Sequence, residues 1–179
     1  MVLHLRYTAR PGGEALKRAA TESLRRVLEA AETTPLARLL SLRHELPGDW
    51  HRFLNPAGDT GDQTLSIPFA GRFPLMFQSA KSKITITRID ILAKAAAGAD
   101  FKLALDPNTP ATPTTRDLTA LGALLVGTTG DITVLPGTGT LRVWRQPSSD
   151  PAVHERVAPD TIQDILLICH YTVTVVPWK

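Results

Sequence analysis

The residues with the clearest capacity for chemistry are two histidines in the first third of the chain, His44 and His51, with Glu45 beside the first. A zinc-protease helix places its histidines about four positions apart with the glutamate between them, so that both imidazoles face one metal ion. Here the histidines are seven positions apart, and Pro47 and Gly48 interrupt the helix that such a site would need. The spacing favours two surface histidines over a metal site.

A second candidate is the single cysteine, Cys169, which is followed directly by His170. Neighbouring side chains on a strand point to opposite faces, whereas a reactive thiolate–imidazole pair needs the two groups to converge. We therefore expect Cys169 to be a small core residue. One cysteine also excludes an internal disulfide, which fits a reducing compartment or an exported chain that does not depend on bridges.

Other catalytic signatures are absent from the sequence, including GxSxG, the P-loop, GxGxxG and CxxC. Asp90 lies within a strand pattern, and an ion pair with Arg88 or Lys94 on the same face is its ordinary explanation. Aromatic residues can line ligand grooves, but with ten aromatics in the chain we expect core use for Trp50, Phe53, Phe69, Phe73 and Phe77. The sequence predicts no catalytic residue, no metal ligand and no cofactor, and hence no enzyme.

Composition is that of a soluble globular protein. The chain has 179 residues, 43% hydrophobic and 21% charged, enough for one domain with a sizeable core. The net charge of +3 comes from 20 basic and 17 acidic residues that are scattered along the chain, so no basic stripe for nucleic acid is expected. No signal peptide is recognisable, and no apolar run approaches the roughly 20 residues of a membrane span. We expect no membrane binding by this chain alone.

The N-terminal part predicts a strand followed by a helix. Apolar and polar residues alternate over 2–8, and Pro11-Gly12-Gly13 ends that strand. From Glu14 to Glu32 the period becomes helical, with an apolar stripe formed by Leu16, Ala20, Leu24, Val27, Leu28 and Ala31. Such a stripe must be covered by the protein's own sheet or by another subunit, and packing on its own sheet is the simpler expectation.

The remainder predicts short strands separated by turns. We expect a short turn carrying Trp50 and Phe53, a helical turn over 162–165, and strands over 65–69, 83–93, 101–105, 118–126, 131–135, 138–145 and 166–176. Residues 36–46 fit either a short helix or a strand. Short strands at this spacing indicate a β-sandwich or barrel. We predict a mainly β fold, a two-sheet antiparallel β-sandwich with one N-terminal amphipathic helix packed on it. Residues 1–34 form the lead-in and 35–179 the sandwich, together one compact domain.

The longest irregular segment is Asp106–Thr115, with three prolines in ten residues. Its prolines exclude a central strand, and surface loops of this length are often functional. As partner-binding residues it offers Asp106, Pro107, Asn108, Pro110 and Pro113. Residues 2–9 also align without gaps to 166–173. An N-terminal strand of that kind could leave an exposed edge that pairs with another chain.

Several short motifs resemble the C-terminal domain of the A subunits of Tc (toxin complex) insecticidal toxins. The resemblance covers nearly the full length and rests on Leu42-Arg43-His44-Glu45-Leu46-Pro47, Trp50, Phe53, Leu65-Ser66-Ile67-Pro68, Arg72-Phe73-Pro74, Ile84-Thr85-Ile86, Asp90-Ile91-Leu92, Asp164-Ile165-Leu166-Leu167 and Tyr171-Thr172, with a lead-in at 3–10 and 12–17. It implies a β-sandwich that docks the B-subunit at the wide end of a pentameric toxin channel. It also favours a strand over residues 36–46. The pore-forming and shell regions of an A subunit are missing, and the helix over 14–32 has no clear place in the toxin.

Together these observations predict a non-enzymatic protein-docking module whose partner is a Tc B-subunit-like protein or a second copy. An adaptor or cargo domain of a contractile injection particle is an alternative. Another is a carbohydrate- or receptor-binding sandwich, in which Trp50, Trp144 or Trp178 would form an exposed platform. The expected location is the bacterial cytoplasm before release, or outside the cell as part of a larger toxin or injection particle.

Overall fold

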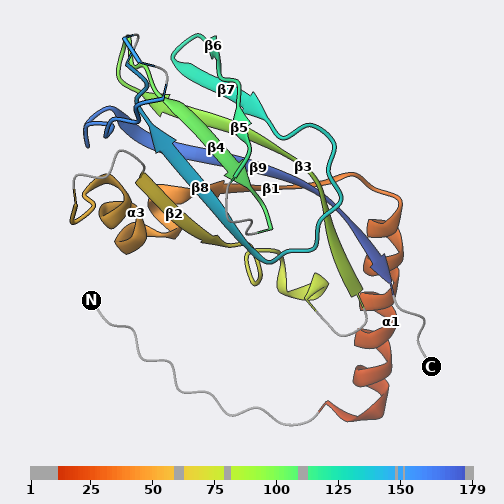
Figure 1. Cartoon of the computed structure of the whole chain (residues 1–179). Coiled ribbons are helices and arrows are strands. Elements are labelled where there is room, and N and C mark those ends of the chain that lie inside the picture. Colours follow the sequence, from red (N-terminus) through yellow and green to blue (C-terminus); the bar gives the residue numbers. More distant parts are fainter. Residues whose placement is uncertain are drawn as a thin grey trace.

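The computed structural model describes residues 12–58, 63–78, 82–108, 113–147, 149–150 and 152–175 (Figure 1). The helical elements are α1 (Gly13–Glu32), α2 (Leu42–Glu45), α3 (Pro47–Leu54) and a 3₁₀ turn, η1 (Leu75–Phe77). The strands are β1 (Leu36–Ser41), β2 (Gln63–Pro68), β3 (Ser82–Ala95), β4 (Lys102–Asp106), β5 (Thr115–Arg116), β6 (Thr119–Leu121), β7 (Leu124–Thr128), β8 (Thr138–Trp144) and β9 (Ile162–Val175).

Two antiparallel sheets face one another, which confirms the predicted sandwich (Figure 1). Sheet A has five strands in the order β1-β9-β3-β7-β6, and sheet B has four in the order β2-β8-β4-β5. The long strands β3 and β9 form the centre of sheet A. Their β-branched and apolar residues suit a pleated surface that is buried on one side or on both.

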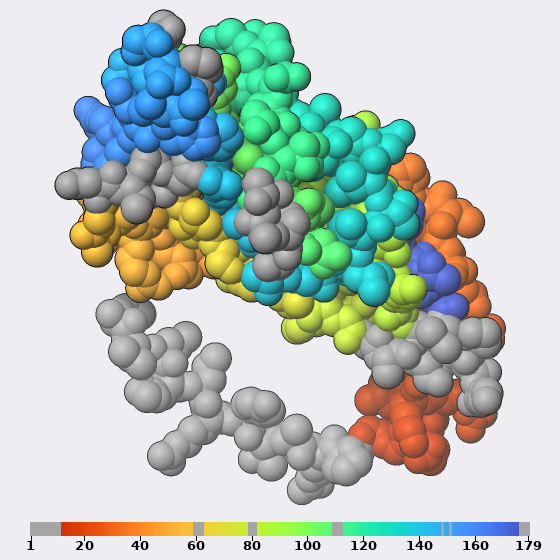
Figure 2. Space-filling model, in the orientation of Figure 1, coloured from red at the N-terminus to blue at the C-terminus, as the bar shows by residue number. Residues whose placement is uncertain are grey.

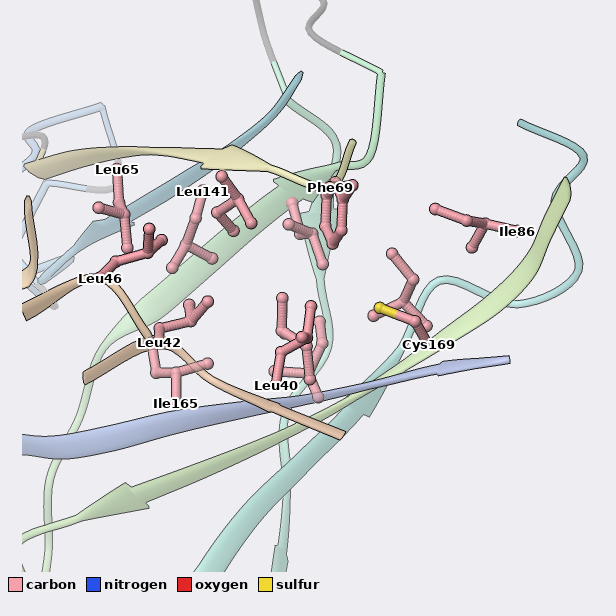
Figure 3. Packing of buried hydrophobic residues seen from close by; sticks show 14 of the residues in the cluster. Leu40, Leu42, Leu46, Leu65, Phe69, Ile86, Leu141, Ile165 and Cys169 are labelled. Carbon is pink, nitrogen blue, oxygen red and sulfur yellow. The ribbon is translucent and has the colours of Figure 1, made fainter. Parts of the chain in front are cut away.

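The core fills the space between the sheets (Figure 3). Sheet A contributes alternate residues of β3 and β9, among them Ile91, Leu167 and Cys169, and each is 0% exposed. The five aromatics expected in the core are all buried: Trp50, Phe53, Phe69, Phe73 and Phe77. Cys169 points into this core while His170 lies on the opposite face of β9, as the strand alternation predicts.

Two predicted strands are wrong. The segment 118–126 is not one strand, because Gly122 takes a left-handed φ of 60° and turns the chain between β6 and β7. The segment 131–135 is not a strand of its own. It makes an isolated bridge from Val134 to Ile86, beside the irregularity between Ile86 and Arg88 in the β3–β9 ladder.

Residues 162–165 are not helical, because β9 already begins at Ile162 and pairs with β3 from there. Residues 36–46 combine both alternatives: the strand ends at Ser41, and α2 follows. The Ser41 side chain accepts a hydrogen bond from the backbone N–H of His44, which starts the helix where a continued strand was expected. Trp50 and Phe53 lie on α3, a helix of eight residues, in place of the short turn.

Helix α1 matches the predicted range, and half of its predicted stripe, namely Leu24, Leu28 and Ala31, packs against the sandwich. Its last turns contact the end of β9, where Leu28 and Ala31 are buried, and the Val175 N–H donates to Glu32 Oε1 over 2.6 Å. Its first turns extend beyond the sheets, and Leu16 and Val27 are 61% and 46% exposed (Figures 1 and 2). Within the described part of the chain, no helix has the length and apolarity to cross a membrane.

Candidate interaction surface

The most unusual surface of the sandwich is the outer face of sheet A, where apolar side chains gather away from the core. We call this set the apolar strip: Leu39, Leu92, Leu121, Leu124, Val126, Leu166 and Ile168. Leu39 and Leu121, at the two edge strands, are 54% and 65% exposed. The other five are half-buried.

Strand register brings these residues together from five segments of the chain. On one level Leu39 pairs with Ile168, and on the next Leu166 pairs with Leu92, which pairs with Val126. The following level ends with Leu124 opposite Leu121. Directly paired side chains on one face lie about 5 Å apart. The strip therefore crosses the sheet diagonally, from the β1 edge to the β6 edge.

The strip is separate from the core. Its neighbours in sequence, such as Ile91, Ala93 and Leu167, are 0% exposed and point to the other side of the sheet. None of the seven strip residues belongs to the core cluster or to the partly buried hydrophobics packed against it. The outer face of a two-layer sandwich is usually polar, since water covers it. An apolar diagonal on such a face makes it a candidate interaction surface.

Charged residues border the strip on both sides. On one side Asp90 Oδ2 lies 2.7 Å from His170 Nε2, and Asp90 Oδ1 lies 3.1 Å from Arg88 Nε. Burial raises the pKa of Asp90, but hydrogen bonds from His170 and Thr128 and the charge of Arg88 outweigh it, so the pKa is lowered overall. The predicted pairing of Asp90 with Arg88 is confirmed.

On the other side of the strip lies Asp164, at the start of β9. Its two carboxylate oxygens accept hydrogen bonds from Ser41 Oγ at 2.7 Å and from the Arg43 backbone N–H at 3.1 Å. Lys94 stands directly opposite Asp164 in the β3–β9 ladder, on the same face of the sheet, so a cation lies beside this carboxylate as well. The strip is thus an apolar diagonal whose two flanks carry charges of both signs.

Ser41, His44 and Asp164 also lie together, although the order of their hydrogen bonds is not that of a hydrolase. Ser41 Oγ lies 3.0 Å from His44 Nδ1 and donates its own proton to Asp164. A catalytic triad needs the histidine between the serine and the acid, so that it can take the serine proton. Here the serine is in the middle and caps α2, which makes the cluster structural.

The two histidines first considered for metal line one cleft of about 700 Å³, together with Arg43, Trp50 and Asp160. His44 and His51 are both exposed, as expected for surface histidines. Over the residues that can be described, no group of three or more His, Cys, Asp or Glu side chains is arranged to hold a metal ion.

The predicted partner-binding loop is anchored at its two ends. Asp106 pairs with Thr140, and its carboxylate accepts the Asn108 N–H over 2.8 Å. Pro107 and Pro113 are buried, and only Asn108 among the described members is exposed. Pro110 lies outside the described residues. The buried prolines offer little contact surface to a partner.

The aromatic platform expected of a carbohydrate-binding sandwich is not present in the described part. Trp50 and Trp144 are 5% and 7% exposed. The Trp144 ring is stacked on His154 with 4.6 Å between ring centroids, so this face of the indole is already occupied. Trp178 lies outside the described residues.

Comparison with known proteins gives no family for this chain. No family model matches it, and no curated protein matches it. A solved structure, the pre-peptidase C-terminal domain of collagenase from Bacillus anthracis, has 14% sequence identity with it. That match covers 78% of this chain and 89% of the other, with a TM-score of 0.26, which is too low to carry any argument about fold or function.

The apolar strip was not predicted from the sequence, although one signal for it exists. The run Ile165-Leu166-Leu167-Ile168-Cys169 in β9 is apolar at every position, as in strands that are buried on both faces. The other strip residues come from strands whose order and register the sequence does not reveal.

Proposed function

We propose that this chain is a non-enzymatic protein-docking module that binds its partner through the outer face of sheet A. The observation that carries the proposal is the apolar strip, seven apolar side chains that lie outside the core, two of them exposed and five half-buried. Burying an apolar surface yields about 25 cal/mol per Å². A surface of a few hundred Å² can therefore anchor a protein interface.

The position of the charges supports the same function. Charged residues are typical of an interface rim, where they orient the partner and exclude wrong partners. Asp90 lies on one flank of the strip with Arg88, and Asp164 lies on the other flank opposite Lys94, which gives the surface an apolar centre and a charged border. A partner of matching chemistry has an apolar ridge bordered by charged residues of both signs.

The resemblance to Tc toxin A subunits suggests the B-subunit as the class of partner, and this suggestion stays a proposal. The proposed docking function does not depend on this resemblance, because an apolar strip on an outer sheet face favours a protein partner by its chemistry alone. An adaptor domain in an injection particle would use the same surface.

The experiment is a titration of the purified chain against a purified Tc B-subunit and against each purified co-encoded protein, by calorimetry. The test variant is Leu166→Glu, which places a charge at the centre of the strip. Its control is Thr64→Glu on the exposed outer face of β2 in sheet B. One partner should bind the wild type and the control equally and Leu166→Glu about 10- to 100-fold more weakly. Equal binding by all three proteins would remove the strip as the docking surface, and binding only on a glycan array would favour the carbohydrate reading.

A further inference from the structure

Strand β1 leaves one edge of sheet A open. Within the described ranges it pairs with β9 on one side only, so the backbone N–H and C=O groups of every second residue point away from the sheet. Its six residues pair with β9 without a bulge and include no proline. The one charged side chain of this strand, Arg38, is held by Glu45 at 3.1 Å, and Leu39 is 54% exposed. The β1 edge therefore has few of the features that usually prevent another strand from adding to a sheet.

The other three sheet edges are short or protected. On the far side of sheet A, β6 has three residues, and the edge strand β5 of sheet B has two. The remaining edge is β2, which ends in Pro68. It is joined to α3 by the Gln63 side chain, which donates to the Phe53 carbonyl at 3.1 Å. Among the sheet edges of the described chain, β1 is therefore the one that is both long and regular.

The sequence contains a segment whose pattern matches the strand that β1 already pairs with. Residues 2–9 (VLHLRYTA) align without gaps to residues 166–173 (LLICHYTV), with identity at Leu3, Tyr7 and Thr8. The second stretch lies in β9, and its first six residues are the ones that pair with β1. The N-terminal segment therefore offers the open side of β1 a pattern of side chains like the one on its paired side.

The faces of the segment agree with those of β1. In the register that β9 uses, Leu3 would stand opposite Leu40, which is 2% exposed and points into the core. Tyr7 would stand opposite the half-buried Leu36, on the same side of the sheet. The polar residues between them would then face outward. A shift by one residue would reverse both faces, so the alternation fixes the register to within two residues.

The segment is too short to pair in this register with β1 of its own molecule. Residues 1–11 lie outside the described residues, and α1 begins shortly after them, at Gly13. The 20 residues of α1 place Gly13 about 28 Å from Glu32. The helix runs from Glu32 away from the sheets, so Gly13 is still farther from β1 (Figure 1). The six residues from Tyr7 to Gly13 span at most about 21 Å, which does not bring Tyr7 to Leu36.

We propose that residues 2–8 of one molecule form a strand that adds antiparallel to the β1 edge of a second copy. Backbone hydrogen bonds supply the affinity of such a contact, and the side chains at alternate positions supply its specificity. Two copies that exchange their segments form a closed dimer, whereas one-way contacts continue into a ring or a filament. The inference does not rest on the proposed function, because it uses the edge of sheet A and the docking partner uses its outer face.

The first test measures the mass of the full purified chain by sedimentation over a range of concentrations. The wild type should associate as its concentration rises. Leu5→Pro removes a backbone donor from the segment and disfavours a strand there, so it should weaken association about 10- to 100-fold. Its control, Leu5→Val, keeps a strand-forming apolar residue and should associate as the wild type does. A wild type that stays monomeric at every concentration, or Leu5→Pro that associates as strongly as the wild type, overturns the inference.

The second test identifies the two strands by cross-linking. In the proposed register Arg6 stands opposite the exposed Ala37, within the distance that a disulfide bridges. Arg6→Cys mixed with Ala37→Cys should give a disulfide-linked heterodimer under mild oxidation. Arg6→Cys mixed with Thr64→Cys, at an exposed position of the β2 edge, should give little. The native Cys169 is 0% exposed and does not compete.

A chain that carries both Arg6→Cys and Ala37→Cys separates the two possible sources of the segment. It should link between molecules and not within one. A link within one chain, no link between Arg6→Cys and Ala37→Cys, or equal linking of Arg6→Cys to Ala37→Cys and Thr64→Cys overturns the inference. None of these results bears on the proposed function, which fails only if a protein partner binds Leu166→Glu as tightly as the wild type.

Discussion

Asp90 and His170 are hydrogen-bonded diagonally across the β3–β9 ladder, with 2.7 Å between Oδ2 and Nε2. Each stands opposite a different residue, since Asp90 pairs with Ile168 and His170 with Arg88. The bond therefore joins two levels of the sheet beside the strip, and it holds the carboxylate in its ionised form.

This pair predicts a loss of stability in acid. The pKa of Asp90 is lowered from 3.8 in the folded state, so the ionised carboxylate stabilises the fold above its unfolded pKa. The contribution is lost as the pH falls through the lower, folded pKa. Urea unfolding between about pH 5 and pH 2 should show the wild type losing more free energy of unfolding than Asp90→Asn. Parallel curves for the two proteins would contradict the assignment.

Gln63 is expected to be the most sensitive polar residue of the core. It is 0% exposed, its Nε2 donates to the Phe53 carbonyl at 3.1 Å, and its Oε1 accepts the Val157 N–H at 2.9 Å. Gln63→Ala would leave both backbone groups unpaired and open a cavity, at a cost of about 2 to 4 kcal/mol. Chemical denaturation measures this cost, with Thr64→Ala on the exposed side of the same strand as a control that should change little.

Replacing either of two glycines by alanine should change the stability of the protein, in opposite directions for the two positions. A Cβ on Gly139 would lie 2.4 Å from Phe69 Cε2 and 2.8 Å from the Asp106 carbonyl oxygen. Gly139→Ala should therefore destabilise the protein by about 1 to 3 kcal/mol. A Cβ on Gly48, within α3, meets nothing within 4 Å. Gly48→Ala should stabilise the protein by about 0.5 to 1 kcal/mol. If thermal melts showed both variants shifting the melting temperature in the same direction, the predictions would be wrong.

Cys169 should be unreactive until the protein unfolds. Burial raises the pKa of its thiol to about 12, and the side chain is 0% exposed. At neutral pH almost no thiolate forms, and the reagent cannot reach the sulfur. A thiol reagent such as dithionitrobenzoate should show no fast reaction with the native protein and one equivalent in denaturant. Rapid labelling of the folded chain would show that β9 opens.

Local chemistry predicted much of the fold. Alternating β-branched residues identified β3, and the breaks at Gly12-Gly13 and Pro35 bounded α1, because these signals depend only on neighbours in the chain. The same reasoning placed Cys169 and His170 on opposite faces. It failed at 162–165 and at 118–126, where pairing with β3 and a single left-handed glycine decided the outcome.

The sequence alone established a chain rich in strands with one amphipathic helix, an apolar Cys169 and no recognisable catalytic motif, because periodicity and composition are local properties. Only the tertiary structure decided which apolar residues lie outside the core. Leu39, Leu92, Val126 and Leu166 lie far apart in the chain, and strand order and register bring them to one face. Register sets which side of a sheet every second residue occupies, so a surface built from five strands exists only once the strands have paired.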